Sequence, residues 1–247
     1  MRGDQHVLIS LFSGGVLLAP WLTVLDPVTV LVLLVSLFIG SLAPDADAPD
    51  ATIFHTRIAG LRGVTGWAAN TVARFLPFFG YLIRYLEYYP LSAALWVASL
   101  GRYQNEHRGL LHSLAGVLLI TLLTAGYLEV FSWLISWSHL DLLPIAAGGF
   151  LAGCLLHLVE DSCTPRGVAW FFPFCSARVR GRITTGFSDS RPQVFILFLI
   201  AAGWGMLLWP QFAGWGVEKM QQISPVLLAV LWATFLAFSG VTLRWHR

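Results

Sequence analysis

Long apolar stretches alternate with short polar stretches along most of the chain. The apolar stretches are continuous, unlike the ten-residue strands of a membrane barrel, in which apolar and polar residues alternate. Continuous apolar runs are typical of membrane-spanning helices, because a helix satisfies its own backbone polar groups. We therefore predict an all-α, polytopic helical membrane protein with about six transmembrane helices, at residues 7–25, 28–43, 110–135, 144–161, 193–211 and 224–243.

Residues 64–100 do not fit this pattern. They are rich in aromatic residues but are interrupted by charges and prolines, namely Arg74, Pro77, Arg84, Glu87 and Pro90. The remainder, residues 91–100, is too short to span alone, since a spanning helix takes about 20 residues. We therefore expect an interfacial or re-entrant helical segment. Because no internal repeat or low-complexity segment stands out, residues 1–247 are expected to form a single integral-membrane domain.

The composition supports the same class of protein. Hydrophobic residues make up 57% of the chain and charged residues 11%, whereas soluble domains contain about 25% charged residues. The formal net charge of +2 is too small to suggest a nucleic-acid partner. The 3 cysteines lack the spacing of a disulfide framework or a metal knuckle. A signal peptide is a competing interpretation of the first residues, but no small-x-small cleavage pattern precedes Trp21.

Positive charge is divided unevenly between the two ends of the predicted helices. With six spanning helices, one face receives most of the arginines, in residues 1–6, 44–63, 101–109, 162–191 and 244–247. The opposite turns contain mostly acidic residues, namely Asp26, Asp141 and Glu218, together with Lys219. Because basic residues favour the cytoplasmic side of a membrane, we expect the arginine-rich face to lie in the cytoplasm.

Candidate metal ligands lie at this same membrane boundary. His157 and Asp161 are four residues apart, so they share one face of a helix. They either bind one metal ion together or form a satisfied polar pair. Other segments bring histidines and aspartates to the same depth, namely His6, Asp45, Asp47, His107 and His112. Convergence of these segments at one depth favours a metal site.

The residue types indicate the metal and its chemistry. Histidine and carboxylate ligands without organised cysteine suit Zn, Mn or Fe, as one or more divalent ions. Such an ion activates water and polarises a phosphoryl or carbonyl oxygen. His107 and His112 are five residues apart and face one site only if the helix starts between them, which Gly109 permits.

The arginines of this face have two interpretations. Arg108 either binds an anionic leaving group or transition state, or contacts lipid headgroups, and Arg166 has the same alternatives. A third group of basic residues suits a topology signal and anionic-lipid patch better than a catalytic role: Arg178, Arg180 and Arg182.

Three motifs in this order resemble a known family. They are Pro-Asp-x-Asp at residues 44–47, His-Arg-Gly-x-x-His-Ser at 107–113, and His-x-x-x-Asp-x-x-Thr-x-x-Gly at 157–167. Their order resembles the YdjM-like family, described as LexA-regulated, inner-membrane proteins assigned as metal-dependent hydrolases. The resemblance runs from His6 to about Gly186. That family looks distantly similar to the zinc-dependent phospholipase C and single-strand nuclease superfamily, and this resemblance alone implies phosphoesterase chemistry.

The resemblance implies a set of functional residues. The implied metal ligands are His6, Asp45, Asp47, His112, His157 and Asp161. As catalytic residues we predict His107 and Arg108, which fill the first two places of the second motif, together with Asp47. Asp45 or Asp47 would act as a general base if it is not fully committed to metal.

The chain departs from the family pattern at three places. Ala48 stands where the family has His, and Leu111 stands where it has Thr. A Glu expected after Thr185-Gly186 is missing, and Gln193 or a neighbour takes its place. The first and third changes would reduce the number of metals or remove a supporting base. His55 is a candidate substitute for the missing His.

The leading hypothesis is a membrane-embedded, metal-dependent hydrolase. It would act at the cytoplasmic membrane surface on a phosphoester or other ester, such as a lipid, through a metal-activated water. The alternative is a non-catalytic membrane protein with a structural or regulatory metal site. A transporter is a weaker hypothesis, because the helix centres are apolar and the ligands gather at one face. The expected partners are the lipid bilayer and a lipid or phosphoester substrate, without nucleic acid.

Overall fold

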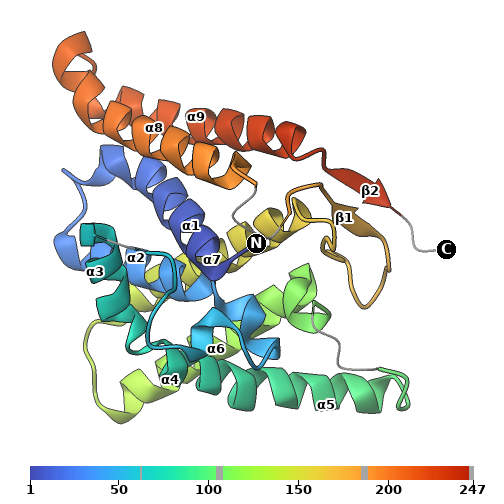
Figure 1. Ribbon diagram of the computed structural model, residues 1–247. Coiled ribbons are helices and arrows are strands. Elements are labelled where there is room, and N and C mark those ends of the chain that lie inside the picture. Colours follow the sequence, from blue (N-terminus) through green and yellow to red (C-terminus); the bar gives the residue numbers. More distant parts are fainter. Residues whose placement is uncertain (62, 104–107, 185–188, 245–247) are drawn as a thin grey trace.

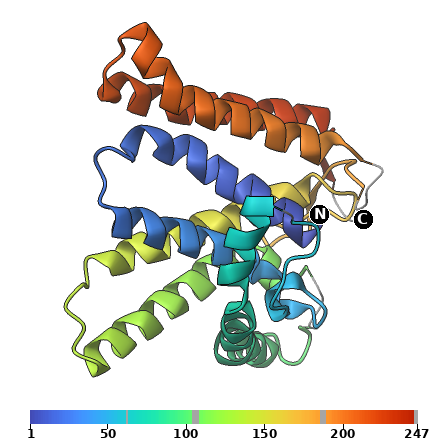
Figure 2. The same ribbon diagram turned by 60° about the vertical axis from the view of Figure 1, so that its left-hand side comes forward.

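The chain folds into a bundle of helical hairpins (Figure 1). The computed structural model describes residues 1–61, 63–103, 108–184 and 189–244. The turns of three hairpins, α1–α2, α6–α7 and α8–α9, lie on one side of the molecule (Figure 2). The N-terminus lies on the other side, toward which the end of α7 also points. This arrangement agrees with the division of the chain into two opposed faces.

The first hairpin consists of two short apolar helices. Helix α1 covers Gly3–Leu18 and continues into a 3-10 turn, η1, at Ala19–Trp21. Helix α2 covers Pro27–Gly40. It begins at Asp26, whose Oδ1 accepts a hydrogen bond of 2.9 Å from the Thr29 backbone N–H, and proline occupies its first position. An acceptor side chain followed by proline is a favourable start for a helix.

The other two hairpins consist of longer helices. They are α6 (Leu114–Leu134) with α7 (Leu142–Ser162), and α8 (Arg191–Ala213) with α9 (Val217–Phe238). Among the described residues, these 4 helices are long and apolar enough to cross a membrane. The prediction of about six spans is not confirmed, because α1 and α2 have only 16 and 14 residues. The helical membrane architecture itself is as predicted.

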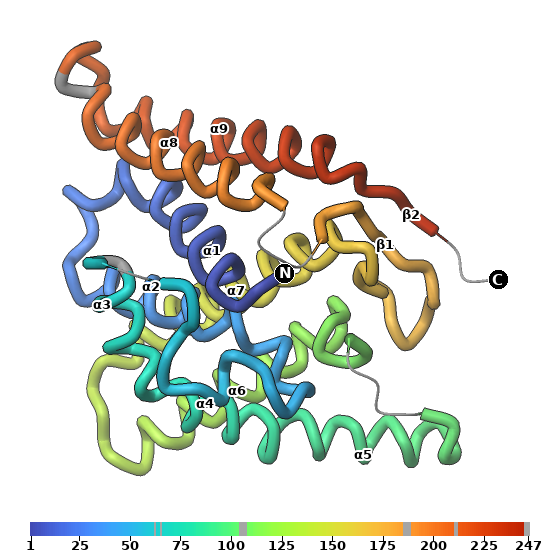
Figure 3. The backbone as a smooth tube through the Cα atoms, in the orientation of Figure 1, coloured from blue at the N-terminus to red at the C-terminus, as the bar shows by residue number. Residues whose placement is uncertain are grey.

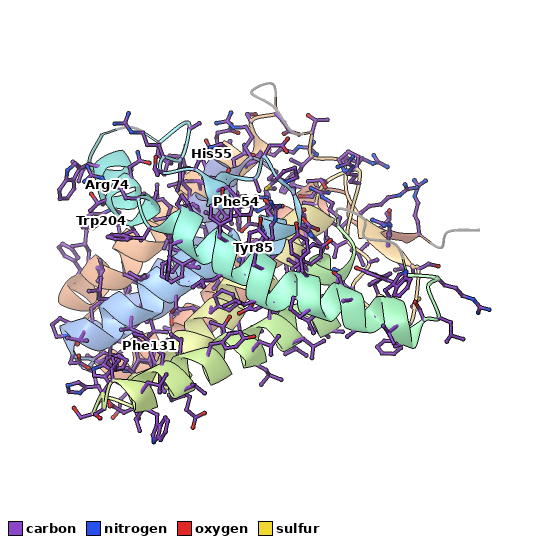
Figure 4. The ribbon with its side chains drawn as sticks, turned by 90° about the horizontal axis from the view of Figure 1, so that it is seen from below. Phe54, His55, Arg74, Tyr85, Phe131 and Trp204 are labelled. Carbon is purple, nitrogen blue, oxygen red and sulfur yellow. The ribbon has the colours of Figure 1, made fainter. Side chains whose placement is uncertain are left out.

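Large apolar side chains on the long helices point away from the protein. Leu122 on α6, Leu197 on α8 and Phe238 on α9 are 69%, 64% and 74% exposed. Phe131 on α6 and Trp204 on α8 also lie on the outside of the bundle (Figure 4). Exposed apolar surface of this extent suits hydrocarbon rather than water, so these helices imply a lipid bilayer around the protein.

Residues 64–100 form further helices that cross the hairpins. They are α3 (Gly63–Ala73), α4 (Leu76–Leu82), a π-helical turn η4 (Ile83–Tyr88) and α5 (Tyr89–Ala98). The run α4–η4–α5 is continuous and is seen nearly end-on where α6 is seen along its length (Figure 2). The predicted helical character is therefore present, and the position of this run in the membrane stays a prediction.

Two of the charges that interrupt this segment, Arg84 and Glu87, contact neighbouring elements of the protein, whereas Arg74 is exposed. Arg84 Nε donates a hydrogen bond of 2.8 Å to Ala46 O, and the guanidinium lies 4.2 Å from the centre of the Phe54 ring. Glu87 is buried and accepts a hydrogen bond of 2.7 Å from Thr124 Oγ1 of α6. Both side chains therefore fasten the crossing helix to its neighbours, and Arg84 reaches the turn that carries Asp45 and Asp47.

Glycines bring α2 and α7 into close contact. A Cβ atom built on Gly40 would lie 2.1 Å from Phe150 O, and one built on Gly153 would lie 2.3 Å from Leu37 O. Small residues of this kind allow two membrane helices to approach until their backbones touch. The close approach places the end of α2 beside the last turns of α7, where His157 lies.

One short β-ribbon was not predicted. Strand β1 (Arg178–Arg180) pairs antiparallel with β2 (Thr242–Arg244), so the polar loop 162–191 is partly ordered by the end of the chain that follows α9 (Figure 3). Gly167 has φ +64, and a Cβ atom there would lie 2.4 Å from Val179 O, so glycine is required for this packing. The ribbon is joined to the end of α7 by Gly181 N–H, which donates to Thr164 O at 3.1 Å.

Candidate metal centre

Four segments of the chain meet at one end of the bundle. His6 comes from α1, and Asp45 from a 3-10 turn, η2 (Ala43–Asp47), that follows α2. His112 ends a second 3-10 turn, η5 (Leu110–His112). His157 and Asp161 lie on the last turns of α7. The candidate ligands therefore converge although up to 155 positions separate them in the chain (161 − 6).

The ligand atoms form two overlapping groups. One group contains His6, Asp45 and His157, and the other contains His112, His157 and Asp161. Within each group the ligand atoms all lie within 4.8 Å of one another. Histidine nitrogen and carboxylate oxygen bind Zn at about 2.0–2.2 Å, so ligands around one ion lie at such separations from each other. His157 belongs to both groups.

The ring of His157 is oriented for metal binding. Its Nδ1 lies 2.7 Å from Ser41 O, and since a carbonyl only accepts hydrogen bonds, Nδ1 carries the proton. Nε2 then presents its lone pair and makes no hydrogen bond within the described part of the chain. It lies 3.6 Å from Asp45 Oδ1 and 3.8 Å from Asp161 Oδ2. Because one lone pair binds one ion, His157 serves a single ion at a time.

His6 is held by a carboxylate that the sequence did not single out. Its Nδ1 lies 2.6 Å from Glu160 Oε2, and Glu160 Oε1 accepts a hydrogen bond of 3.1 Å from Ser10 Oγ. The His6 ring stacks on His157, with 4.1 Å between ring centres. Histidine ligands commonly donate their second ring N–H to a carboxylate, which fixes the ring and raises its basicity. Glu160 could have been found as a second acid beside Asp161 in an otherwise apolar helix.

Replacing Glu160 with glutamine is expected to weaken metal binding. The amide keeps the size of the side chain but changes the carboxyl group that faces His6 Nδ1, so the affinity should fall by roughly 10–100-fold. Isothermal titration calorimetry, in which Zn is added to metal-free protein in detergent, measures this affinity. The matched control is Glu129→Gln. Glu129 is exposed on α6, the helix that also carries Leu122, and this variant should bind metal with the affinity of the unaltered protein. Equal affinity in both variants would contradict the role of Glu160.

His112 lies between two aspartates. Its Nε2 is 3.4 Å from Asp45 Oδ1 and 3.6 Å from Asp161 Oδ2, while its Nδ1 is 3.5 Å from Asp47 Oδ2. Burial lowers the pKa of His112, but the hydrogen bonds to Asp45 and Asp47 outweigh it and raise the pKa to about 9. Asp47 lies beside Nδ1 of the ring, whereas Asp45 and Asp161 lie beside Nε2. Neither group of candidate ligands among the described residues includes Asp47.

Arg108 closes the site beside Asp161. Its Nη2 lies 2.7 Å from Asp161 Oδ2, and its Nη1 donates a hydrogen bond of 3.0 Å to Thr164 Oγ1. Its backbone N–H donates to Asp47 Oδ2 at 3.0 Å. Arg108 has φ +67, in the left-handed region that costs a non-glycine residue about 1 kcal/mol or more. In this backbone conformation the N–H of Arg108 contacts Asp47 while its guanidinium contacts Asp161.

Carboxylates and ring nitrogens gather at this point. Asp47 and Asp161 are buried and Asp45 is 21% exposed, and their positive partners are Arg108, the His112 ring with its raised pKa, and the Met1 amino group, which lies 3.0 Å from Asp161 Oδ1. Burial raises the pKa of Asp45, but the neighbouring His157 and His112 hold that pKa well below its usual range. Buried carboxylates are costly unless cations offset them, and the His157 Nε2 lone pair faces two carboxylate oxygens, an arrangement that a metal ion between them would satisfy. The donor set therefore fits a divalent metal ion.

The predicted site residues differ in where the structure places them. His6, Asp45, His112, His157 and Asp161 converge, and Asp47 and Arg108 lie directly behind them. His107 falls outside the described residues. His55 is exposed at the surface (Figure 4) and belongs to neither ligand group of the described residues, so it does not replace the His missing at Ala48.

Fold and site together define a helical membrane protein with a buried histidine–aspartate cluster at one end of its bundle. A family model for the YdjM inner membrane protein matches residues 1–246, so the chain belongs to that family. No curated protein and no solved structure matched the chain. Family membership and the apolar helices place the protein in a membrane.

Proposed function

We propose that this protein is a metal-dependent hydrolase of the inner membrane. Its substrate would be a phosphoester or other ester at the cytoplasmic membrane surface. The observation that supports this most is His157, whose Nε2 lone pair faces two carboxylates and lacks a hydrogen bond to any described residue. A buried imidazole in this position is poorly explained as a structural polar pair, since its acceptor atom faces other acceptors.

The roles of the side chains follow from their contacts. His6, Asp45, His112, His157 and Asp161 would hold one divalent ion, Zn or else Mn or Fe. A bound ion of this kind acts as a Lewis acid and activates water for hydrolysis. Asp45 has the most exposed side chain among these ligands, at 21% against 2% or less for the others, so water and substrate would approach on its side.

Asp47 and Arg108 support the site in this proposal. Asp47 is 1% exposed and bound to His112 and Arg108, so it orients His112 rather than meeting the substrate. The guanidinium of Arg108 is engaged by Asp161 and Thr164, and its first role is to position Asp161. Asp45 is then the better candidate for the general base, because its carboxylate borders solvent.

The same proposal includes the orientation in the membrane. Residues 1–247 would form one integral-membrane unit, with the arginine-rich end in the cytoplasm. Helix α1 and turn η1 together continue from Gly3 to Trp21, which is close to the length of a spanning helix. Helix α2 is about 21 Å long at 1.5 Å per residue. Six crossings therefore require the bilayer to be thin beside α2.

Purified protein tests the proposal through its metal content and its activity. We expect about one equivalent of Zn, Mn or Fe per chain by mass spectrometry, and hydrolysis of at least one ester in a panel of phosphomonoesters, phosphodiesters and phospholipid vesicles. A protein that contains no such metal and takes none up on addition would contradict the proposal. Bound metal without hydrolysis of any ester would instead favour a structural or regulatory metal site. The contacts of Asp47 with His112 and of Arg108 with Asp161 are also compatible with that function.

A further inference from the structure

The β-ribbon gathers positive charge without acidic partners. We use the name arginine ribbon for strands β1 and β2 with the two arginines beside β1, and its basic residues are Arg166, Arg178, Arg180, Arg182 and Arg244. Residues 162–184 and 239–244 contain no aspartate or glutamate. The nearby Asp189 is already bound to Arg191, at 2.6 Å from its Nη2. Within the described residues, no ion pair neutralises the arginine ribbon.

The strand register adds to this charge. Arg178 and Arg244 are direct partners across the ribbon, so two like charges lie opposite each other. Like charges in this position destabilise a strand pair unless an anion lies between or beside them. Arginine binds phosphate with two parallel hydrogen bonds, and phosphate is therefore the anion that this arrangement fits best.

Exposed apolar side chains lie beside these arginines. Phe174 is 88% exposed and Phe171 is 61% exposed, in the loop before β1, and Leu243 of β2 is 59% exposed. Arginine next to exposed aromatic residues is the pattern of a surface at the lipid headgroups, where cations meet phosphate and rings reach the acyl boundary. The phenylalanines favour a lipid over a nucleic acid as the source of the phosphate.

The arginine ribbon borders the metal centre. Ile183 N–H donates to Cys163 O at 2.9 Å, and Gly181 N–H donates to Thr164 O at 3.1 Å. The hydroxyl of Thr164 accepts the hydrogen bond from Arg108, which in turn contacts Asp161. Only the turn at the end of α7 therefore separates the ribbon from the candidate ligands.

We propose that the arginine ribbon binds the headgroups of anionic phospholipids. Acidic glycerophospholipids are then the substrate class of the hydrolase, a statement that rests on the proposed function. We expect the ribbon to bind phosphate groups held in a membrane, because there the arginines contact the phosphates while the exposed rings contact the acyl chains. The ribbon concentrates this class of lipid next to the site where Asp45 borders solvent.

Lipid binding by the full-length protein in detergent tests this proposal. Fluorescent phosphatidylglycerol and phosphatidylcholine are titrated into unaltered protein and into a triple variant, Arg178→Gln with Arg180→Gln and Arg244→Gln. We expect phosphatidylglycerol to bind the triple variant about 100-fold more weakly, since each basic residue near an anionic surface contributes a factor of about five. Phosphatidylcholine binding should stay the same. The control variant Arg57→Gln with Arg74→Gln and Arg102→Gln loses the same charge elsewhere and should keep the preference.

The outcomes separate the ribbon from the hydrolase. Unchanged preference in the triple variant, equal loss in the control, or displacement of the lipid by a single-stranded oligonucleotide overturns the ribbon proposal. Each titration is repeated after chelation, because binding to the ribbon needs no metal. If the unaltered protein takes up no metal but still prefers phosphatidylglycerol, the proposed hydrolase function is contradicted and the ribbon proposal stands. Arg244→Gln, an exposed single change, replaces the triple variant if that variant unfolds, and a fivefold loss is then expected.

Discussion

Replacing His157 with alanine is expected to abolish metal binding. His157 belongs to both groups of candidate ligands, so its loss leaves neither group complete. His6 and His112 would keep their carboxylate neighbours but would lose the nitrogen that lies between them. We expect the metal content of the purified variant to fall from about one equivalent to background, measured by mass spectrometry on protein of the same detergent extraction.

The control for this change is His139→Ala. His139 is exposed in the turn between α6 and α7, at the end of the bundle away from the candidate ligands, and its removal should leave the metal content unchanged. A His157→Ala protein that folds and keeps its full complement of metal would show that the ion lies elsewhere. The proposed metal centre would then be wrong, whatever activity the protein has.

Replacing Arg108 with alanine is expected to produce the largest loss of stability. Asp161 is 1% exposed, with its Oδ2 at 2.7 Å from Arg108 Nη2 and its Oδ1 at 3.0 Å from the Met1 amino group, so the change leaves this buried carboxylate with one of these two cations. Removal of one partner from a buried ion pair costs about 3–5 kcal/mol when the other charge is left uncompensated, and because the Met1 amino group remains, we expect a loss below that range. Thermal unfolding of the metal-free protein in detergent should show a clearly lower midpoint, whereas Arg102→Ala, an exposed arginine, should not.

Metal should restore part of the stability of the Arg108 variant. A ligand at 100 times its dissociation constant stabilises the folded state by about 2.7 kcal/mol. A divalent ion beside Asp161 replaces the lost positive charge, so the midpoint of Arg108→Ala should rise on adding Zn. If Arg108→Ala unfolds at the temperature of the unaltered protein without metal, the ion pair with Asp161 does not stabilise the fold.

Much of the site could be predicted from the sequence because membrane burial restricts what polar residues can do. His6, His112, His157 and Asp161 lie at the ends of apolar runs, where ionisable residues are costly without a function. Their motifs added the resemblance to a family, and the family match covers the chain. The structure brings these residues together, while their binding of metal stays a prediction.

Other features depend on contacts that no periodicity encodes. The separate roles of Asp45 and Asp47 follow from the turn η2, which directs one aspartate to the ligand group and the other to the far side of His112. Glu160 acts on His6, which is 154 positions away (160 − 6), so its contact could not be read from neighbouring residues. The arginine ribbon pairs two 3-residue strands that lack an alternating apolar pattern.

The distribution of the ligands along the chain makes the metal centre sensitive to assembly. Taken alone, α1–α2 brings His6, and the segment after it brings Asp45, while His157 and Asp161 arrive only with α7. The group of His6, Asp45 and His157 combines the first hairpin with α7, whereas His112, His157 and Asp161 all lie within residues 112–161. A chain in which α1–α2 has inserted wrongly relative to α7 therefore lacks the first group, and all five candidate ligands meet only when both hairpins are in place. Full metal binding by these five residues would therefore indicate correct insertion of about the first two thirds of the protein, independent of any reaction it performs.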